Sequence, residues 1–304
     1  RLHGAGFESA AVLPPFSRLV FDEAHNLEHS ATSFFSETLA SAFIAKQISR
    51  LYRQKKGKTL GLALTLQRMA GENDIFREIP KSVSDLSAQA KLLDEQTCGI
   101  LGSKMTFRIT DREEQFMQEV SPLLTELRDR INRLISFIKD ALDLLNEEDQ
   151  ESPAAFETKT LLARLSGQAA LCGYFLEREE HPDKVFWIET VRRSGNDPMA
   201  RYIISPLHIG ERMAEAVYEP MKTLVCTSAT LSIKEDFSYL RNKIGLTSAW
   251  DERTDSVIFP SPFAYKERVF LGIPSDAPNP ADAAYVPYII DFIKKALEVS
   301  EGRA

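Results

Sequence analysis

Two adjacent carboxylates, Asp22 and Glu23, directly follow a short apolar run at residues 19–21. Such a run predicts a buried parallel strand, and open α/β sheets place their chemistry just beyond the carboxyl ends of their strands. There, one carboxylate can hold Mg²⁺ while the other orients or deprotonates an attacking water, as phosphoryl transfer requires. The alternative is an acidic turn that caps the next helix. These residues alone do not choose between the two.

A second motif whose side chains could take part in a reaction is Thr227-Ser-Ala-Thr230, which follows another short apolar run at residues 223–226. That run also predicts a buried strand. Small hydroxyl residues at a strand end are common turn formers, so this motif by itself is weak evidence. It gains weight only together with Asp22-Glu-Ala-His25, because the two motifs follow two predicted strands in this order along the chain.

The segment between the two motifs has mostly helical periodicity. From residue 27 to 51 apolar residues recur at three- and four-residue steps, which predicts one amphipathic helix with a basic end, Arg50 to Lys58. Cations suit a helix carboxyl terminus, and contact with phosphates is the alternative explanation. Gly57-Lys58-Thr59 resembles the end of a phosphate loop, but Tyr52 stands where that pattern requires glycine. We therefore do not predict a nucleotide site there.

Further elements follow from periodicity and breakers. We expect helices at 60–71, 82–97, 111–149 with a kink at Pro122, and 154–180, and a short strand at 105–109. Strands at 185–191 and 200–204 should form a hairpin. Beyond them we expect helices at 209–220, 237–244 and 281–300, an extended segment at 259–265 and a strand at 268–273. The sequence thus predicts an α/β fold interrupted by a large, mostly α-helical insertion.

Composition narrows the class of protein. The 304 residues carry a formal net charge of −7, so no global basic signature marks a nucleic-acid binder. Three widely spaced cysteines, Cys98, Cys172 and Cys226, predict neither a disulfide framework nor a zinc site and favour a cytoplasmic setting. No apolar run is long enough to span a membrane. Because the chain starts at Arg1 and stops just after a predicted helix, we expect it to be a piece of a longer protein.

Taken in order, Asp22-Glu-Ala-His25 and Thr227-Ser-Ala-Thr230 resemble motifs II and III of superfamily 2 helicases. The helical insertion between them resembles the arch of the XPD-like branch, and Ser205-Pro-Leu207 and Ser261-Pro-Phe-x-Tyr265 resemble the DinG/YoaA-type proteins. The resemblance covers essentially the whole chain, tightly at the two motifs and loosely across the insertion. It implies a P-loop (RecA-like) motor fragment plus an arch domain. The implied boundaries are 1–26 and 205–254 for motor domain 1, 27–204 for the arch with its terminal hairpin, and 255–304 for the start of motor domain 2.

The resemblance also implies a role for each motif residue. Asp22 would coordinate the Mg²⁺ of bound ATP, Glu23 would position or activate the hydrolytic water, and His25 would link the nucleotide site to the neighbouring motif. Thr227, Ser228 and Thr230 would couple hydrolysis to domain movement. For His25, a purely structural role is an equally good alternative, in which the imidazole makes a local hydrogen bond at the start of a helix.

The parts that the resemblance requires but this sequence lacks are the phosphate loop, the arginine-bearing motif VI and the four cysteines of a 4Fe-4S cluster. Cys98, Cys172 and Cys226 do not match those cluster ligands. We therefore expect the isolated chain to bind neither ATP tightly nor a cluster.

The implied function is an ATP-dependent DNA helicase that moves 5′ to 3′ on single-stranded or forked DNA in DNA repair. Candidate DNA contacts are the basic residues Arg53 to Lys58 and the pair Arg192 and Arg193. Two alternatives remain open: a related single-strand nuclease, and an arch module that recruits a replication or repair partner.

Overall fold

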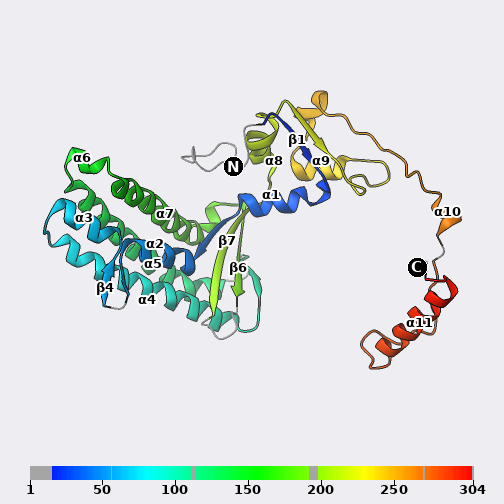
Figure 1. Cartoon of the computed structure of the whole chain (residues 1–304), viewed down its shortest axis with the longest axis horizontal. Helices are drawn as coiled ribbons and strands as arrows, with labels where there is room; N and C mark the ends of the chain where they lie inside the picture. Colours follow the sequence, from blue (N-terminus) through cyan, green and yellow to red (C-terminus); the bar gives the residue numbers. More distant parts are fainter. Residues whose placement is uncertain (1–15, 56, 111–113, 192–197, 270, 303–304) are drawn as a thin grey trace. The chain divides into compact units, whose positions relative to one another are not determined.

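The computed structural model describes residues 16–55, 57–110, 114–191, 198–269 and 271–302 (Figure 1). The chain divides into two units, Arg1–Asp255 and Ser256–Ala304. Helices and strands both contribute, so the mixed α/β class and the mostly helical character of the long middle segment are confirmed. No described helix is both long enough and apolar enough to cross a membrane.

The smaller of two hydrophobic cores in the first unit packs against one face of a pair of parallel strands. β1 (Arg18–Phe21) pairs with β8 (Thr223–Cys226) from Arg18↔Thr223 to Phe21↔Cys226. Three helices pack with them: α1 (Leu27–Phe35), α8 (Gly210–Met213) and α9 (Ser238–Ile244). Shorter turns complete this part, namely Ala24–Asn26, a π-helical turn at Ala214–Tyr218, and Ser248–Arg253. The parallel pairing places the ends of both predicted strands side by side.

The larger core lies between a helical bundle and an antiparallel sheet. The helices are α2 (Ser41–Leu51), α3 (Leu62–Ala70), α4 (Ile75–Leu101), α5 (Glu114–Asp143), α6 (Glu147–Gln150) and α7 (Pro153–Leu176), followed by a short turn at Arg178–Glu180. The sheet has the order β2-β7-β6-β5, with β2 at Glu37–Ala40, β5 at Thr106–Arg108, β6 at Lys184–Val191 and β7 at Met199–Pro206. A separate hairpin joins β3 (Arg53–Lys55) to β4 (Lys58–Leu60). Because β2 and β7 are neighbours, the chain enters and leaves this part along adjacent strands.

The single helix predicted for residues 27–51 is wrong. α1 ends at Phe35, Ser36 has extended backbone, and β2 intervenes before α2. Leu39 is 1% exposed and belongs to the larger core, so its burial and the pairing of β2 with β7 outweigh the helical spacing. Two other helices differ in their bounds from the prediction: α4 begins at Ile75 and runs through Pro80, and α5 ends at Asp143. α5 continues through Pro122, as the predicted single helix requires.

The second unit contains α10 (Tyr265–Arg268) and α11 (Tyr285–Val299). The helix predicted at 281–300 is confirmed as α11, whereas the strand predicted at 268–273 is wrong. Arg268 ends α10, and Leu271 and Ile273 are about four-fifths exposed at 80% and 81%. A strand needs a hydrogen-bonding neighbour, and no described segment of this unit pairs with these residues.

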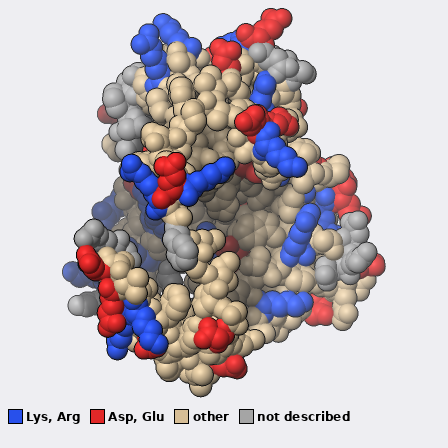
Figure 2. All heavy atoms as spheres, turned by 90° about the vertical axis from the view of Figure 1, so that its right-hand side faces the viewer, with Lys and Arg blue, Asp and Glu red and all other residues tan. Residues whose placement is uncertain are grey.

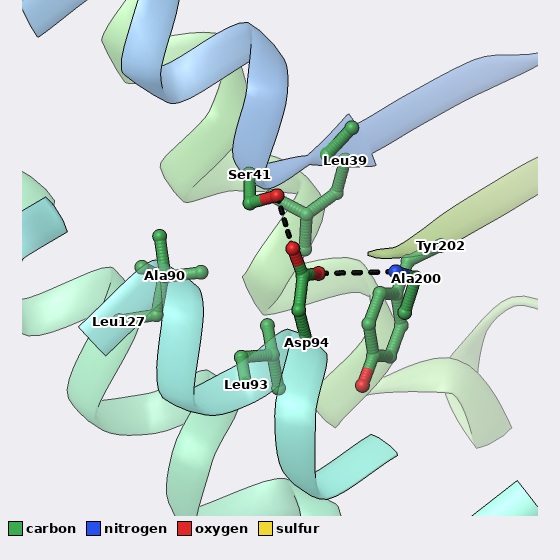
Figure 3. Close-up of a pocket in the computed structure, with 9 residues that line it drawn as sticks. Leu39, Ser41, Ala90, Leu93, Asp94, Leu127, Ala200 and Tyr202 are labelled. Carbon is green, nitrogen blue, oxygen red and sulfur yellow. Dashed lines mark hydrogen bonds between the residues drawn. The ribbon is translucent and has the colours of Figure 1, made fainter. Parts of the chain in front are cut away.

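Buried polar side chains fasten the sheet to the bundle, and Asp94 of α4 is central among them (Figure 3). Its carboxylate accepts hydrogen bonds from Ser41 Oγ, in the first residue of α2, and from Ala200 N of β7 at 3.1 Å. Desolvation raises the pKa of the Asp94 carboxyl, and the bond from Ser41 opposes part of this rise. Three separate elements therefore meet at one carboxylate.

Replacing Asp94 tests this junction. Asp94→Asn keeps an acceptor for Ala200 N and removes a buried charge, so we expect a change in unfolding free energy of no more than about 1 kcal/mol. Asp94→Leu leaves the Ala200 N–H and the Ser41 hydroxyl without this acceptor and should cost about 1–3 kcal/mol. Chemical denaturation near neutral pH measures both values, and equal losses would contradict the arrangement.

The same site has a defined pH dependence. Because the Asp94 pKa is raised in the folded state, the folded chain holds this proton more tightly than the unfolded chain does. The contribution of protonated Asp94 to the unfolding free energy is fully present below pH 3.8, the ordinary pKa of the group. It is lost as pH rises from there through the raised pKa. Asp94→Asn should abolish this part of the pH dependence of stability.

Candidate functional site

The two predicted motifs are in direct contact at the carboxyl ends of β1 and β8. Thr227 N donates to Phe21 O and Ala24 N donates to Thr227 O, both at 2.9 Å, so the backbone ladder continues beyond the strands. The Thr227 hydroxyl donates to Asp22 Oδ1 at 2.8 Å. Residues 205 positions apart in the chain are thereby fixed against each other.

Glu23 makes the turn out of β1 in an unusual backbone conformation. Its φ of 50° and ψ of 44° are left-handed, which costs a non-glycine residue about 1 kcal/mol or more. The turn allows Glu23 N to donate to Asp22 Oδ1 at 3.0 Å, and it leads into the short turn Ala24–Asn26, where Ala24 is buried. Local strain is thus concentrated on one of the two predicted catalytic carboxylates.

The Ser228 hydroxyl joins Glu23 to His25. Ser228 Oγ lies 3.3 Å from Glu23 Oε2 and 2.9 Å from His25 Nδ1, and His25 Nδ1 lies 3.2 Å from Glu23 Oε2. Thr230 N donates to Ser228 Oγ at 3.4 Å. Because an ionised carboxylate only accepts hydrogen bonds, this set of contacts favours a proton on Nδ1 of His25.

Asp22 has the chemistry that a magnesium ligand needs. Its Oδ1 accepts two hydrogen bonds, whereas Oδ2 has no hydrogen-bond partner among the described residues, and the residue is exposed. Protein Mg²⁺ sites commonly use one or two carboxylates, with waters and substrate phosphates as further ligands. Within the described ranges no group of three His, Cys, Asp or Glu side chains could hold a metal. Asp22 therefore fits a Mg²⁺ ion that also binds a phosphate.

The strands that carry the motifs are buried on one face only. Phe21, Leu224 and Cys226 pack against the smaller core, but Val20 is 64% exposed and Val225 42% exposed. The prediction of parallel strands is confirmed, while the prediction that they are buried is wrong for this second face. Among the described residues neither strand has another neighbour. Parallel sheets are normally covered on both faces.

The candidate DNA-contact residues Arg53, Lys55 and Lys58 belong to the β3–β4 hairpin and not to the ends of β1 and β8. The other candidates, Lys56, Arg192 and Arg193, lie outside the described residues. Ser205 serves the fold, since its hydroxyl bonds Ser36 Oγ at 2.7 Å and Trp187 Nε1 at 3.0 Å.

None of the three cysteines forms a disulfide with another described residue. Burial raises the pKa of the Cys172 thiol to about 12 and also raises that of Cys226. A cysteine nucleophile is therefore not supported at the strand ends.

Comparison with known proteins gives a consistent set of relatives, although no protein-family model matches the chain. It is 23% identical over 303 residues to the ATP-dependent DNA helicase YoaA of Escherichia coli, covering 96% of this chain and 40% of that protein. It is 23% identical to the ATP-dependent DNA helicase DinG of Photobacterium profundum, covering 92% and 40% respectively. It is 20% identical to the 3′-5′ exonuclease DinG of Bacillus subtilis, covering 92% and 31%. The resemblance to DinG/YoaA-type helicases is confirmed, and the chain spans two-fifths or less of these relatives.

The contacts around Ser228 predict the tautomer of His25. We expect neutral His25 to carry its proton on Nδ1, whereas exposed His29 of α1 should show the ordinary mixture of tautomers. Long-range ¹H–¹⁵N spectra of the imidazole groups distinguish the two. Glu23→Gln should shift His25 toward the Nε2–H form, and a spectrum of His25 that this substitution leaves unchanged would contradict the proposed contact.

Proposed function

We propose that this chain is part of an ATP-dependent DNA helicase of the DinG/YoaA type, and that the β1–β8 junction forms one side of its ATP-hydrolysis site. The observation that carries the proposal is the direct contact between Asp22-Glu-Ala-His25 and Thr227-Ser-Ala-Thr230 at the ends of two parallel strands. The relatives, which are named as helicases, support it over nearly the whole chain.

Each side chain has a role that its contacts allow. Asp22 would hold Mg²⁺ through its carboxylate, and Thr227 donates to Oδ1 of the same carboxylate. Glu23 orients or deprotonates the attacking water, and Ser228 and His25 hold its carboxylate in place. When bound, ATP would supply the phosphoryl group, and Mg²⁺ would neutralise negative charge on its phosphates. Thr230, whose backbone contacts Ser228, is the outer residue of this network.

The domain assignment is part of the proposal. Residues 1–26 and 205–254 belong to motor domain 1, 27–204 to the arch, and 255–304 to the start of motor domain 2. We move α1 to the motor side, because Leu27 and Ala31 pack in the smaller core and the larger core begins at Leu39. The exposed face of β1 and β8 supports a larger motor domain in the parent protein, in which further strands extend this sheet and helices cover Val20 and Val225.

The parent protein would act on single-stranded or forked DNA in the cytoplasm. Movement from 5′ to 3′ and a role in DNA repair rest on the family resemblance alone. A 4Fe-4S cluster would require cysteines other than the three present here.

A single-strand nuclease is the second candidate, because one relative is named a 3′-5′ exonuclease. In this chain the described carboxylates offer no metal cluster of the kind a nuclease uses, so any nuclease site would have to be built elsewhere in the parent protein. Recruitment of a replication or repair partner by the arch is compatible with either activity.

Glu23→Gln in the full-length protein tests the hydrolytic role. Loss of the general base should lower DNA-stimulated ATP hydrolysis by about 10²–10⁴-fold, while ATP binding persists because Asp22 is unchanged. Glu28→Gln on α1, whose carboxylate binds Lys243 at 3.0 Å, is the matched control and should leave the rate nearly unchanged. Retained turnover in Glu23→Gln would contradict the assignment.

Ser228→Ala and Thr230→Ala separate hydrolysis from coupling in the same protein. Ser228 contacts Glu23, so its loss should lower hydrolysis and unwinding together by about tenfold, as expected when one hydrogen bond to a charged group is lost. The Thr230 side chain has no contact with Glu23 among the described residues, so Thr230→Ala should impair unwinding more than hydrolysis. Equal losses of both activities in Thr230→Ala would argue against a coupling role.

A further inference from the structure

We propose that the β3–β4 hairpin of the insertion is a second, separate binding site, which contacts the phosphate backbone of single-stranded nucleic acid. The choice of a nucleic acid as the ligand rests on the proposed function. The site itself rests on the charge and geometry of the hairpin.

The hairpin lies in the most one-sided stretch of charge in the sequence. Between Glu37 and Glu72 there are seven Lys and Arg residues and no Asp or Glu, in a chain with a formal net charge of −7. By contrast, positive and negative side chains are interspersed on the face of the molecule drawn in Figure 2. A local basic segment is what an otherwise acidic protein needs in order to bind a polyanion.

Strand pairing concentrates these charges on one face of the hairpin. Lys55 lies directly opposite Lys58, and Arg53 lies opposite Leu60, so all four side chains share a face. The three cations are exposed, and none forms an ion pair with a described residue, whereas nearby Arg50 pairs with Glu157. Like charges directly opposite each other destabilise a hairpin. An anion held between Lys55 and Lys58 relieves that repulsion.

The hairpin is fixed to the bundle at both ends. Before it, Tyr52 N donates to Ile48 O at 2.8 Å, and Tyr52 packs against the larger core. After it, Gly61 has a φ of 129°, and a Cβ atom at this position would lie 2.3 Å from Leu51 O. Only glycine allows the chain to pass so close to the end of α2. The position of the basic face is therefore set by the core and not by the loop alone.

The surroundings favour a phosphate backbone over a folded protein partner. Leu60, at 39% exposed, is the apolar neighbour on the basic face, and the opposite face carries Gln54 and Thr59. Protein interfaces depend on buried aromatic and aliphatic anchors, whereas contacts to phosphates need only cations and exposed polar groups. An acidic peptide is the competing ligand that the experiment must distinguish.

The test compares two triple variants of this chain that lose the same charge. Arg53→Gln/Lys55→Gln/Lys58→Gln alters the hairpin, and Lys81→Gln/Arg133→Gln/Lys139→Gln alters exposed cations of α4 and α5. Fluorescence anisotropy with a labelled oligothymidylate measures affinity across a salt series. The hairpin variant should bind at least about tenfold more weakly, and its salt slope should fall by about 2, since each phosphate contact on a single strand contributes about 0.7. The control should change little.

Gly61→Ala provides a second variant that keeps every charge. This substitution should weaken binding of the oligothymidylate because it displaces the hairpin. Circular dichroism should show that the helical content is unchanged. Equal losses in both triple variants, or no loss in the hairpin variant, would overturn the proposal. So would a hairpin variant that loses binding to polyglutamate but retains binding to the oligonucleotide, because the ligand would then be an acidic protein segment. Failure of the Glu23→Gln experiment would remove the ATPase assignment without changing any of these outcomes.

Discussion

The register between β1 and β8 is the constraint on which the candidate site depends. Phe21 lies opposite Cys226, so the next residues of the two strands, Asp22 and Thr227, meet at the same edge. A shift of one residue would reverse the side chains of a strand and separate the carboxylates from the hydroxyl groups that hold them. The left-handed backbone of Glu23 is a local cost of this arrangement, and the contacts from Ser228 and His25 help to offset it.

The pairing of β2 with β7 explains how the two motifs can meet although a long segment separates them in the sequence. β2 and β7 run antiparallel as neighbours, so the segment between them leaves and returns at one place. The Ser36 and Ser205 hydroxyls bond to each other at this point. The helical bundle has its own core, anchored to the sheet by Asp94 and by Gln168, which bonds Thr38 O and Ala40 N. The long middle segment is therefore held together by its own core, separate from the smaller core beneath β1 and β8.

Short-range patterns in the sequence encode the elements that are predicted correctly. The parallel strands, the long helices and the β6–β7 hairpin follow from apolar periodicity, and the two motifs follow from residue type at strand ends. The predictions are wrong where pairing between distant segments decides the secondary structure. The helical spacing of apolar residues concealed β2, because Leu39 fits both the helical and the strand pattern. Residues 268–273 have the composition of a strand, but they pair with no strand among the described residues. No local signal could predict that Ser228 bridges Glu23 and His25, since these contacts join positions 205 and 203 residues apart.

We propose that Asp22 and its neighbours form the magnesium side of an ATP-hydrolysis site. The most direct measurement is the Mg²⁺ dependence of DNA-stimulated ATP hydrolysis by the full-length protein and by Asp22→Asn. Asn keeps the size of the side chain and an acceptor for Thr227 but removes the charge that binds the metal. If the Asp22 carboxylate binds the metal, Asp22→Asn should need much more Mg²⁺ to reach a strongly reduced maximal rate. An unchanged Mg²⁺ dependence with an unchanged maximal rate would contradict it.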